Sequence, residues 1–205
     1  MRKLLAFCAL ALMAGYVQAQ VTAGKMMIGG NVGYSTQTSE SVYGESKHKT
    51  FNANQQFGYF VVDNLAVGLE TNFSQIKSNF DYLDAIDTDA KNTNTTIAPF
   101  VRYYMFTSNA KFAFNAEAAV GFGVAKFRGT NDDEFKTNIF TARLSPGFSY
   151  FLSDKWALDL QLSGISYSSS DQRTDADAGN GKTSSFMFGV SSLNPYLGFR
   201  HFIGK

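Results

Sequence analysis

The chain has 205 residues and a nearly balanced charge, with 18 Lys and Arg against 17 Asp and Glu, and it is rich in aromatic residues, with 20 Phe and 10 Tyr. This balance supplies no basic surface that would point to nucleic acid. No uninterrupted apolar run after residue 19 approaches the roughly 20 residues that a membrane helix needs. A chain of this kind can enter a membrane only as a closed barrel, which leaves no strand edge unpaired in lipid.

The first nineteen residues have the pattern of a secretory signal that is cleaved. Arg2 and Lys3 precede the apolar run LLAFCALALMAGYV, and Val17-Gln18-Ala19 places small residues at the last and third-last positions. We therefore predict a signal peptide over residues 1–19 and a single mature domain over residues 20–205.

Loss of the signal changes the charge and the cysteine content of the chain. It removes two basic residues and leaves 16 against 17 acidic ones, a formal net charge of −1. The only cysteine, Cys8, is also removed. The mature domain therefore has no disulfide, no thiolate nucleophile and no cysteine-bound metal.

Residues 112–124, FAFNAEAAVGFGV, alternate with a period of two. One set is mainly large and apolar and the other small or polar: Phe112, Phe114, Ala116, Ala118, Val120, Phe122 and Val124 against Ala113, Asn115, Glu117, Ala119, Gly121 and Gly123. Successive side chains point to opposite faces of a strand, so this pattern predicts a long β-strand with one apolar face.

The same alternation predicts eight strands. Their approximate ranges are 25–35, 49–62, 65–75, 93–106, 112–124, 136–151, 156–167 and 185–203. The last strand is the least regular, because Ser191-Ser192 and Pro195 interrupt its pattern.

The connections between these strands alternate in length. Those after the second, fourth and sixth strands are tight (VDNL, TSNAK and LSDK). Those after the first, third, fifth and seventh are longer and polar (STQTSESVYGESKH, QIKSNFDYLDAIDTDAKN, RGTNDDE and SSSDQRTDADAGNGKTS). Short turns on one side and long loops on the other are typical of an outer-membrane barrel. The predicted fold is all-β, an eight-stranded antiparallel up-and-down transmembrane β-barrel.

The small-residue faces of the last six strands each carry a charged residue, at similar depth within each of three neighbouring pairs of strands. In chain order these are Glu70, Arg102, Glu117, Arg143, Asp159 and Arg200. Neighbouring strands would pair Glu70 with Arg102, Glu117 with Arg143, and Asp159 with Arg200. Unpaired charges buried inside a barrel would cost several kcal/mol each. We therefore expect a neutral network that fills the lumen, which in an eight-stranded barrel is narrow.

A soluble eight-stranded barrel of the lipocalin kind is the main structural alternative. Such a barrel is apolar inside and polar outside, whereas a membrane barrel is the reverse. In a soluble barrel the six charged residues, Glu70 included, would face water and the apolar faces would form the interior. In a membrane barrel the charged residues face the lumen, and the long apolar stripes lie outward against lipid.

The signal, the eight strands, the phrase GYFVVDNLAVGLE at residues 58–70 and the ending NPYLGFRHF resemble the OmpA/OmpX-like small outer-membrane β-barrel family (outer membrane protein beta-barrel domain). The resemblance covers nearly all of residues 20–205. It implies location in the outer membrane of a Gram-negative bacterium. It also implies insertion by machinery that recognises an aromatic last strand, here Phe199 and Phe202. The chain departs from the usual ending by continuing with Ile203-Gly204-Lys205.

The family includes structural, adhesive and host-interaction proteins and a few lipid-modifying enzymes. We expect a monomeric protein of the structural or surface-interaction kind that is not an enzyme, with a filled lumen and any binding in its extracellular loops. Its expected partners are outer-membrane lipid, the insertion machinery and an extracellular molecule. No catalytic residue, cofactor or metal is predicted, although the spacing of Asp87–Asn92 and Asp175–Asn180 leaves weak loop-bound Ca²⁺ open.

Two alternatives remain at this level. A barrel enzyme acting on lipid A or phospholipid would need a His and a Ser within hydrogen-bonding distance on one wall, built on His48 or His201. A narrow channel would need the network of Glu70, Arg102, Glu117 and Arg143 to open.

Overall fold

The computed structural model describes residues 21–41, 44–82, 85–129, 134–173, 181–189 and 196–204. The predicted signal peptide, residues 1–19, lies outside the described residues. No described segment forms a helix with the length and apolar character needed to cross a membrane.

The described residues form ten β-strands in one antiparallel sheet. They are β1 (Met26–Ser41), β2 (Gly44–Val62), β3 (Leu65–Tyr82), β4 (Ala85–Phe106), β5 (Phe112–Arg128), β6 (Glu134–Ser153), β7 (Trp156–Gln161), β8 (Ile165–Arg173), β9 (Gly181–Phe188) and β10 (Tyr196–Ile203).

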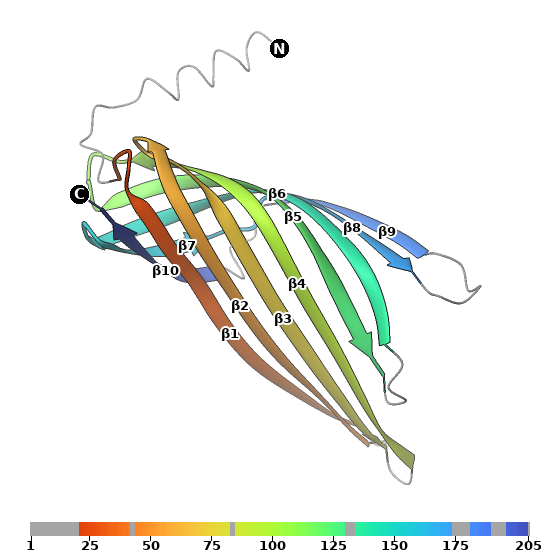
Figure 1. Ribbon diagram of the computed structural model, residues 1–205. Coiled ribbons are helices and arrows are strands. Elements are labelled where there is room, and N and C mark those ends of the chain that lie inside the picture. The colour runs from red at the N-terminus through yellow and green to blue at the C-terminus, as the bar shows by residue number, and fades with distance from the viewer. Residues whose placement is uncertain are drawn as a thin grey trace.

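The sheet closes into the predicted eight-stranded barrel (Figure 1). Each of β1 to β6 pairs with the next, β7 pairs with β10, and β10 pairs with β1 from Met26↔Ile203 to Gly30↔Phe199. β7 and β8 pair one after the other with the same strand, β6, and β9 pairs with β8. The predicted seventh strand is therefore β7 with β8, and the eighth is β9 with β10.

Pro146 explains why the seventh strand is interrupted. β6 pairs with β7 at Gly147↔Gln161 and with β8 at Leu144↔Ile165, so two residues of β6 face residues 162–164. Pro146 has no backbone N–H to donate, and its carbonyl accepts from Leu162 at 2.9 Å. The extra residue opposite it is a bulge, which the alternation of side chains did not reveal.

The first four strands are longer than predicted. β1 and β2 stay paired to Ser41↔Gly44, and β3 and β4 to Tyr82↔Ala85, so the predicted loops 35–48 and 75–92 are mostly strand. β9 likewise begins inside the predicted loop 168–184. The prediction stopped where the apolar alternation stops, but the backbone hydrogen bonds of the barrel strands continue beyond it without an apolar face.

The three short turns lie where they were predicted. Asp63 and Asn64 join β2 to β3, residues 107–111 join β4 to β5, and Asp154 and Lys155 join β6 to β7. Asn64 has a φ of 67°, a conformation that Asn tolerates better than most residues. Asp63 Oδ1 accepts a hydrogen bond from the backbone N–H of Ala23 at 2.8 Å, which ties the chain before β1 to this turn.

The outer face is apolar, as expected for a barrel that faces lipid. Large apolar residues are exposed along it; Val32, for example, is 73% exposed. Outward-facing aromatic residues lie near the short turns (Tyr59, Tyr150, Trp156) and again farther along the strands (Tyr34, Phe51, Phe122, Tyr167). Two aromatic girdles that flank an apolar band are typical of transmembrane barrels. This arrangement excludes the lipocalin-like alternative, whose apolar face would be the inner one.

An aromatic cluster fills the barrel at the short-turn end. Phe60, Tyr104, Phe151 and Phe202 are buried and in ring contact, with centroids 5.4 Å apart for Phe151 and Phe202 and 5.9 Å apart for Phe60 and Tyr104. Val21 is fully buried in the same core, and its carbonyl accepts from the Asn64 N–H at 3.0 Å. The barrel is thus packed with side chains at this end.

Candidate functional site

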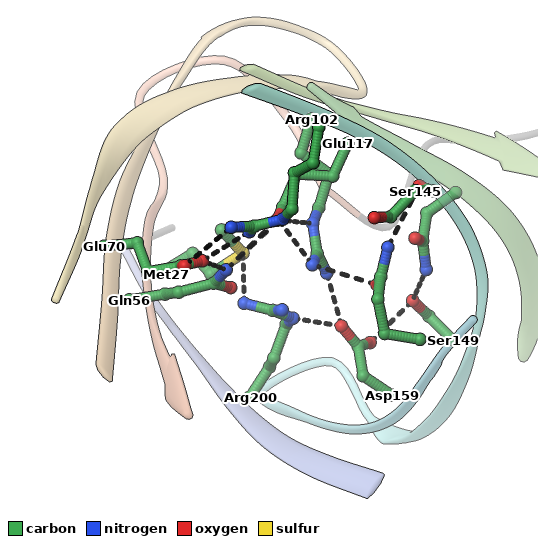
Figure 2. A network of polar contacts seen from close by, with 12 residues as sticks. Met27, Gln56, Glu70, Arg102, Glu117, Ser145, Ser149, Asp159 and Arg200 are labelled. Carbon is green, nitrogen blue, oxygen red and sulfur yellow. Dashed lines mark hydrogen bonds and ion pairs between the residues drawn. The ribbon is translucent and has the colours of Figure 1, made fainter. Parts of the chain in front are cut away.

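The six charged residues singled out in the sequence gather inside the barrel. Figure 2 shows Glu70, Arg102, Glu117, Asp159 and Arg200 pointing toward one another from the surrounding strands. β3 supplies Glu70, β4 Arg102, β5 Glu117, β6 Arg143, β7 Asp159 and β10 Arg200. Five of them are buried, and Arg143 keeps 30% of its side chain exposed. Inward-facing positions of different strands therefore converge on one cluster.

Arg102 is the central cation of this cluster. Its Nε lies 2.8 Å and its Nη2 2.6 Å from Glu117 Oε2, and its Nη1 contacts Asp159 Oδ2. Glu117 is on the neighbouring strand, but Asp159 is on β7, three strands away around the ring. The Arg102 side chain therefore reaches across the lumen instead of lying along one wall.

Glu70 is held by a second contact across the lumen. Arg143 donates to both of its carboxylate oxygens, from Nη1 at 2.8 Å and from Nη2 at 2.6 Å, and also contacts Glu117. Gln56 of β2 donates to Glu70 and, at 3.2 Å, to Glu117. A two-point contact between guanidinium and carboxylate is among the strongest pairings that side chains make.

Asp159 links the cluster to the far wall. Its Oδ2 is shared by Arg102 and Arg200, and its Oδ1 accepts from the Ser149 hydroxyl at 2.7 Å. Ser149 in turn accepts from the Asn115 amide at 2.8 Å. The carboxylate is therefore satisfied on both oxygens, as a buried charge requires.

Met27 brings the first strand into the network. The Tyr104 hydroxyl lies 3.3 Å from its sulfur, and Arg200 Nη1 lies 3.6 Å from the same atom. With Gln56 on β2, all eight strands of the ring thus contribute a side chain to one connected group.

The cluster is electrically neutral, because three guanidinium groups face three carboxylates. Every carboxylate contacts at least one guanidinium. The charge of each buried carboxylate is therefore compensated inside the barrel. The arrangement therefore suits cross-linking of the barrel walls and closure of the lumen.

The contacts differ in one respect from the expected pairs. Glu117 contacts Arg143 and Asp159 contacts Arg200, as expected. Glu70, in contrast, contacts Arg143 and not Arg102: it lies opposite Ala98 of β4, while Arg102 lies opposite Ala66 and Glu117. Counting residues along each strand separately does not include the stagger between neighbouring strands. This stagger decides which charged residues lie nearest to one another.

Several members of this core were not singled out from the sequence. Gln56, Ser149 and Tyr104 lie on inward-facing positions. Ser149 and Tyr104 share β6 and β4 with recognised charged residues, whereas Gln56 lies on β2, which carries none of the six. Phe60, Phe151 and Phe202 were harder to find, because they are large apolar residues on the face expected to be small or polar. A usable signal was their position, since all three lie within a few residues of a short turn or of the chain end.

Phe199 and Phe202, the two aromatic residues of the predicted insertion signal, lie on opposite faces of β10. Phe199 is 57% exposed toward the outside, whereas Phe202 is buried against Phe60 and Phe151. Only Phe199 presents its ring on the outer surface of the folded barrel.

His48 lies within hydrogen-bonding distance of a serine on the neighbouring strand. His48 and Ser78 are directly opposite one another on β2 and β3, and His48 Nδ1 lies 2.8 Å from Ser78 Oγ. The edge of the His48 ring packs on Phe80, with centroids 5.5 Å apart. His201, near the short-turn end of β10, instead contacts Trp156 and the Lys155 carbonyl.

Metal-binding residues do not cluster in the part of the chain that the structure describes: no three His, Cys, Asp or Glu residues come together there as ligands. Asp87–Asn92, considered as a calcium loop, lies within β4. Asp175–Asn180 lies outside the described residues.

Comparison with known families agrees with this architecture. A sequence model of the family described as outer membrane protein beta-barrel domain matches residues 5–192. No curated protein sequence matches the chain.

Solved structures of several small barrels are similar to the chain. Neisserial surface protein A is 14% identical, with 87% of this chain and 97% of that chain covered and a TM-score of 0.48. OprG from Pseudomonas aeruginosa is 16% identical, with 92% and 100% covered and a TM-score of 0.43. Ail, the attachment invasion locus protein of Yersinia pestis, is 19% identical, with 89% and 100% covered and a TM-score of 0.36.

Proposed function

The chain belongs to the outer membrane protein beta-barrel domain family, and from that premise we propose that it is a structural or surface-interaction protein with a closed lumen. The observation that carries this proposal is the neutral charge cluster to which every strand of the ring contributes. The aromatic cluster next to it supports the same conclusion, because it packs the short-turn end of the barrel.

Opening the lumen would separate buried ion pairs. Leaving a buried charge without its partner costs about 3–5 kcal/mol. At about 1.4 kcal/mol per tenfold change in an equilibrium constant, even the lower value keeps an open form below roughly 1%. The cluster is thus too stable to act as a freely opening gate for solutes.

Conductance in planar lipid bilayers tests the closed lumen. We expect the refolded wild-type protein to give no discrete current steps at either polarity. A change in gel mobility on boiling, measured on the same preparation, shows that the silent protein is folded. Reproducible current steps from folded wild-type protein would overturn the proposal and favour the narrow channel.

The long hairpins are the parts of the protein proposed to meet an extracellular partner. The β1–β2 and β3–β4 pairings continue well past the aromatic residues of the outer face. Since the only cysteine lies in the predicted signal, single cysteines can be introduced without background. A membrane-impermeant maleimide added to intact cells is expected to label Ser39→Cys in the first hairpin and not Asp154→Cys in a short turn. The reverse pattern would show that the barrel is oriented the other way.

A second candidate function, a lipid-modifying barrel enzyme, is favoured by the contact between His48 and Ser78. Three features weigh against it. No contact with a carboxylate is recorded for His48 within the described residues, so no group of that kind orients the ring. The pair uses Nδ1, the atom that binds the orienting carboxylate in a Ser-His-Asp triad. Both strands are paired on both sides, which leaves no backbone N–H for an oxyanion hole.

Release of fatty acid from lipid A or phospholipid vesicles tests this candidate directly. We expect the same low background rate from refolded wild-type protein and from Ser78→Ala. A wild-type rate above background that is lost in Ser78→Ala would establish the enzyme.

We also propose that the last strand directs insertion of the barrel. Phe199 presents an aromatic ring on the outer face, and Leu197, 58% exposed on the same face, provides a matched aliphatic position. Phe199→Ala should slow the appearance of folded protein in the outer membrane, and Leu197→Ala should not. Equal rates in both variants would remove the aromatic requirement. The ring closes through β1 and β10 without a second chain, so we expect a monomer in detergent.

A further inference from the structure

Three lysines form a row on the outer face of the barrel, across the adjacent strands β2, β3 and β4. These three strands lie side by side in Figure 1. The register places Lys49 directly opposite Lys77, and Lys77 directly opposite Lys91. All three side chains are exposed, and within the described part of the chain no hydrogen bond or ion pair is recorded for any of them. The same register continues from Lys91 to Arg128 on β5.

Such a row is unfavourable in the protein alone. Residues directly opposite in an antiparallel pair have Cβ atoms about 4.5–5.5 Å apart, and like charges at that distance destabilise the sheet. The next outward positions toward the short turns, Phe51, Gln75 and Thr93, supply no acid. On the side of the long hairpins, the next outward position of β4 is Asp89, which accepts a hydrogen bond from Asn79. The corresponding position of β2 is a further lysine, Lys47. The row therefore keeps an excess of positive charge.

The position of the row relative to the apolar band identifies its surroundings. Tyr59 marks the girdle near the short turns, and Lys49 lies ten residues away on the same face of β2. At about 3.4 Å per residue and a tilt of about 40°, this spans roughly 26 Å along the membrane normal, against roughly 25 Å for the apolar band of such barrels. The ammonium groups thus lie at the head-group layer on the side of the long hairpins.

Aromatic residues separate the lysines from the apolar band. Phe51 and Phe73 lie on the outward faces of β2 and β3 below the row, with ring centroids 6.2 Å apart. Girdles of aromatic residues flank the apolar band of transmembrane barrels at both membrane interfaces. A lysine above such a boundary can lay its apolar stem along the rings and keep its ammonium group in the polar layer.

We propose that Lys49, Lys77 and Lys91 form a binding site for the phosphate groups of an anionic glycolipid in the outer leaflet, of the lipid A type. Lipid is favoured over soluble phosphate because the row faces outward and continues directly from the lipid-facing band. Phosphate oxygens would neutralise the like charges that the register brings together. This inference goes beyond the proposed function, and it does not depend on whether the lumen is closed.

The test uses the unfolding midpoint of the refolded full barrel in a neutral, phosphate-free detergent while lipid A is titrated in. A ligand that binds only the folded state raises this midpoint with its concentration. The variant is Lys49→Gln with Lys77→Gln, and the matched control is Lys111→Gln with Lys155→Gln, which removes the same charge at the short turns. Each lysine near an anionic surface contributes about a fivefold change in affinity, so the variant should bind about thirtyfold more weakly.

The expected result is a rise in the midpoint for the wild type and the control, a much smaller rise for the variant, and little rise with dephosphorylated lipid A. The rise should also shrink as salt is added. An equal response of wild type and variant, or an equal response to dephosphorylated lipid, would overturn the proposal. An equal rise of the midpoint with inorganic phosphate at the same concentration would overturn the assignment of a lipid as the source of the bound phosphate. If the variant does not refold, the comparison of lipid A with dephosphorylated lipid A on the wild-type protein still decides whether the phosphate groups are recognised.

Discussion

Replacement of Arg102 by Met should destabilise the barrel by leaving the buried charge cluster with one uncompensated negative charge. The substitution removes the contacts of Arg102 with Glu117 and Asp159 and changes the net charge of the cluster from zero to −1. Breaking a buried ion pair typically costs about 3–5 kcal/mol. Because Arg143 still contacts Glu117 and Arg200 still contacts Asp159, we expect the lower end, about 3 kcal/mol.

A second substitution separates the charge effect from the loss of packing. Glu117→Gln in the Arg102→Met background returns the cluster to neutrality, with two guanidinium groups facing two carboxylates. The double variant should therefore be more stable than Arg102→Met alone, and its loss should be well below the sum of the two single losses.

Urea unfolding in neutral detergent measures these differences, and the only tryptophan, Trp156, reports on them. Trp156 is half exposed on the outer face near the short turns, so its emission should change when the barrel leaves the micelle. Lys155→Met, an exposed turn position, serves as the control and should stay within about 0.5 kcal/mol of wild type. A double variant that loses the full sum of the single losses would refute the reasoning that the cluster acts as one neutral unit.

Three further expectations follow from other parts of the barrel. The mature protein should fractionate with the outer membrane and migrate differently on gels before and after boiling; a freely soluble protein without detergent would contradict the outward apolar face. Gly68→Ala should lower the free energy of unfolding in urea by about 1–3 kcal/mol, because a Cβ there would lie 2.1 Å from the Phe57 carbonyl oxygen. Gly33→Ala, where a Cβ would have nothing within 4 Å, should be nearly neutral. Equal losses at both glycines would count against the close packing at Gly68. Asn64→Val should lower the unfolding free energy by about 1–2 kcal/mol, because the backbone φ is 67° at this position. Asn64→Gly should not lower it, because glycine adopts this conformation readily. Similar stability of the two variants would mean that the turn rearranges freely.

The sequence by itself determined the architecture of this protein. The period of two over residues 112–124 identified a strand and its two faces, because side chains alternate across a strand whatever surrounds it. Asp63 and Asn64 identified a tight turn between two apolar runs. The placement of Glu70 or Arg102 inside the barrel followed from the same alternation, since these charges share a face with small and polar residues. All of these are local properties of the chain.

The tertiary structure decided what depends on the offset between strands and on the curvature of the sheet. Glu70 contacts Arg143 and not Arg102 because closure of the ring brings β3 and β6 across the lumen from each other. Phe202 packs inside the barrel because the short-turn end must be filled, although its residue type suggested an outer position. The lysine row of Lys49, Lys77 and Lys91 arises only when three strands are held in register. Alternation within a strand fixes the face of each residue, whereas its neighbours across the sheet and the lumen are set by pairing and closure of the whole barrel.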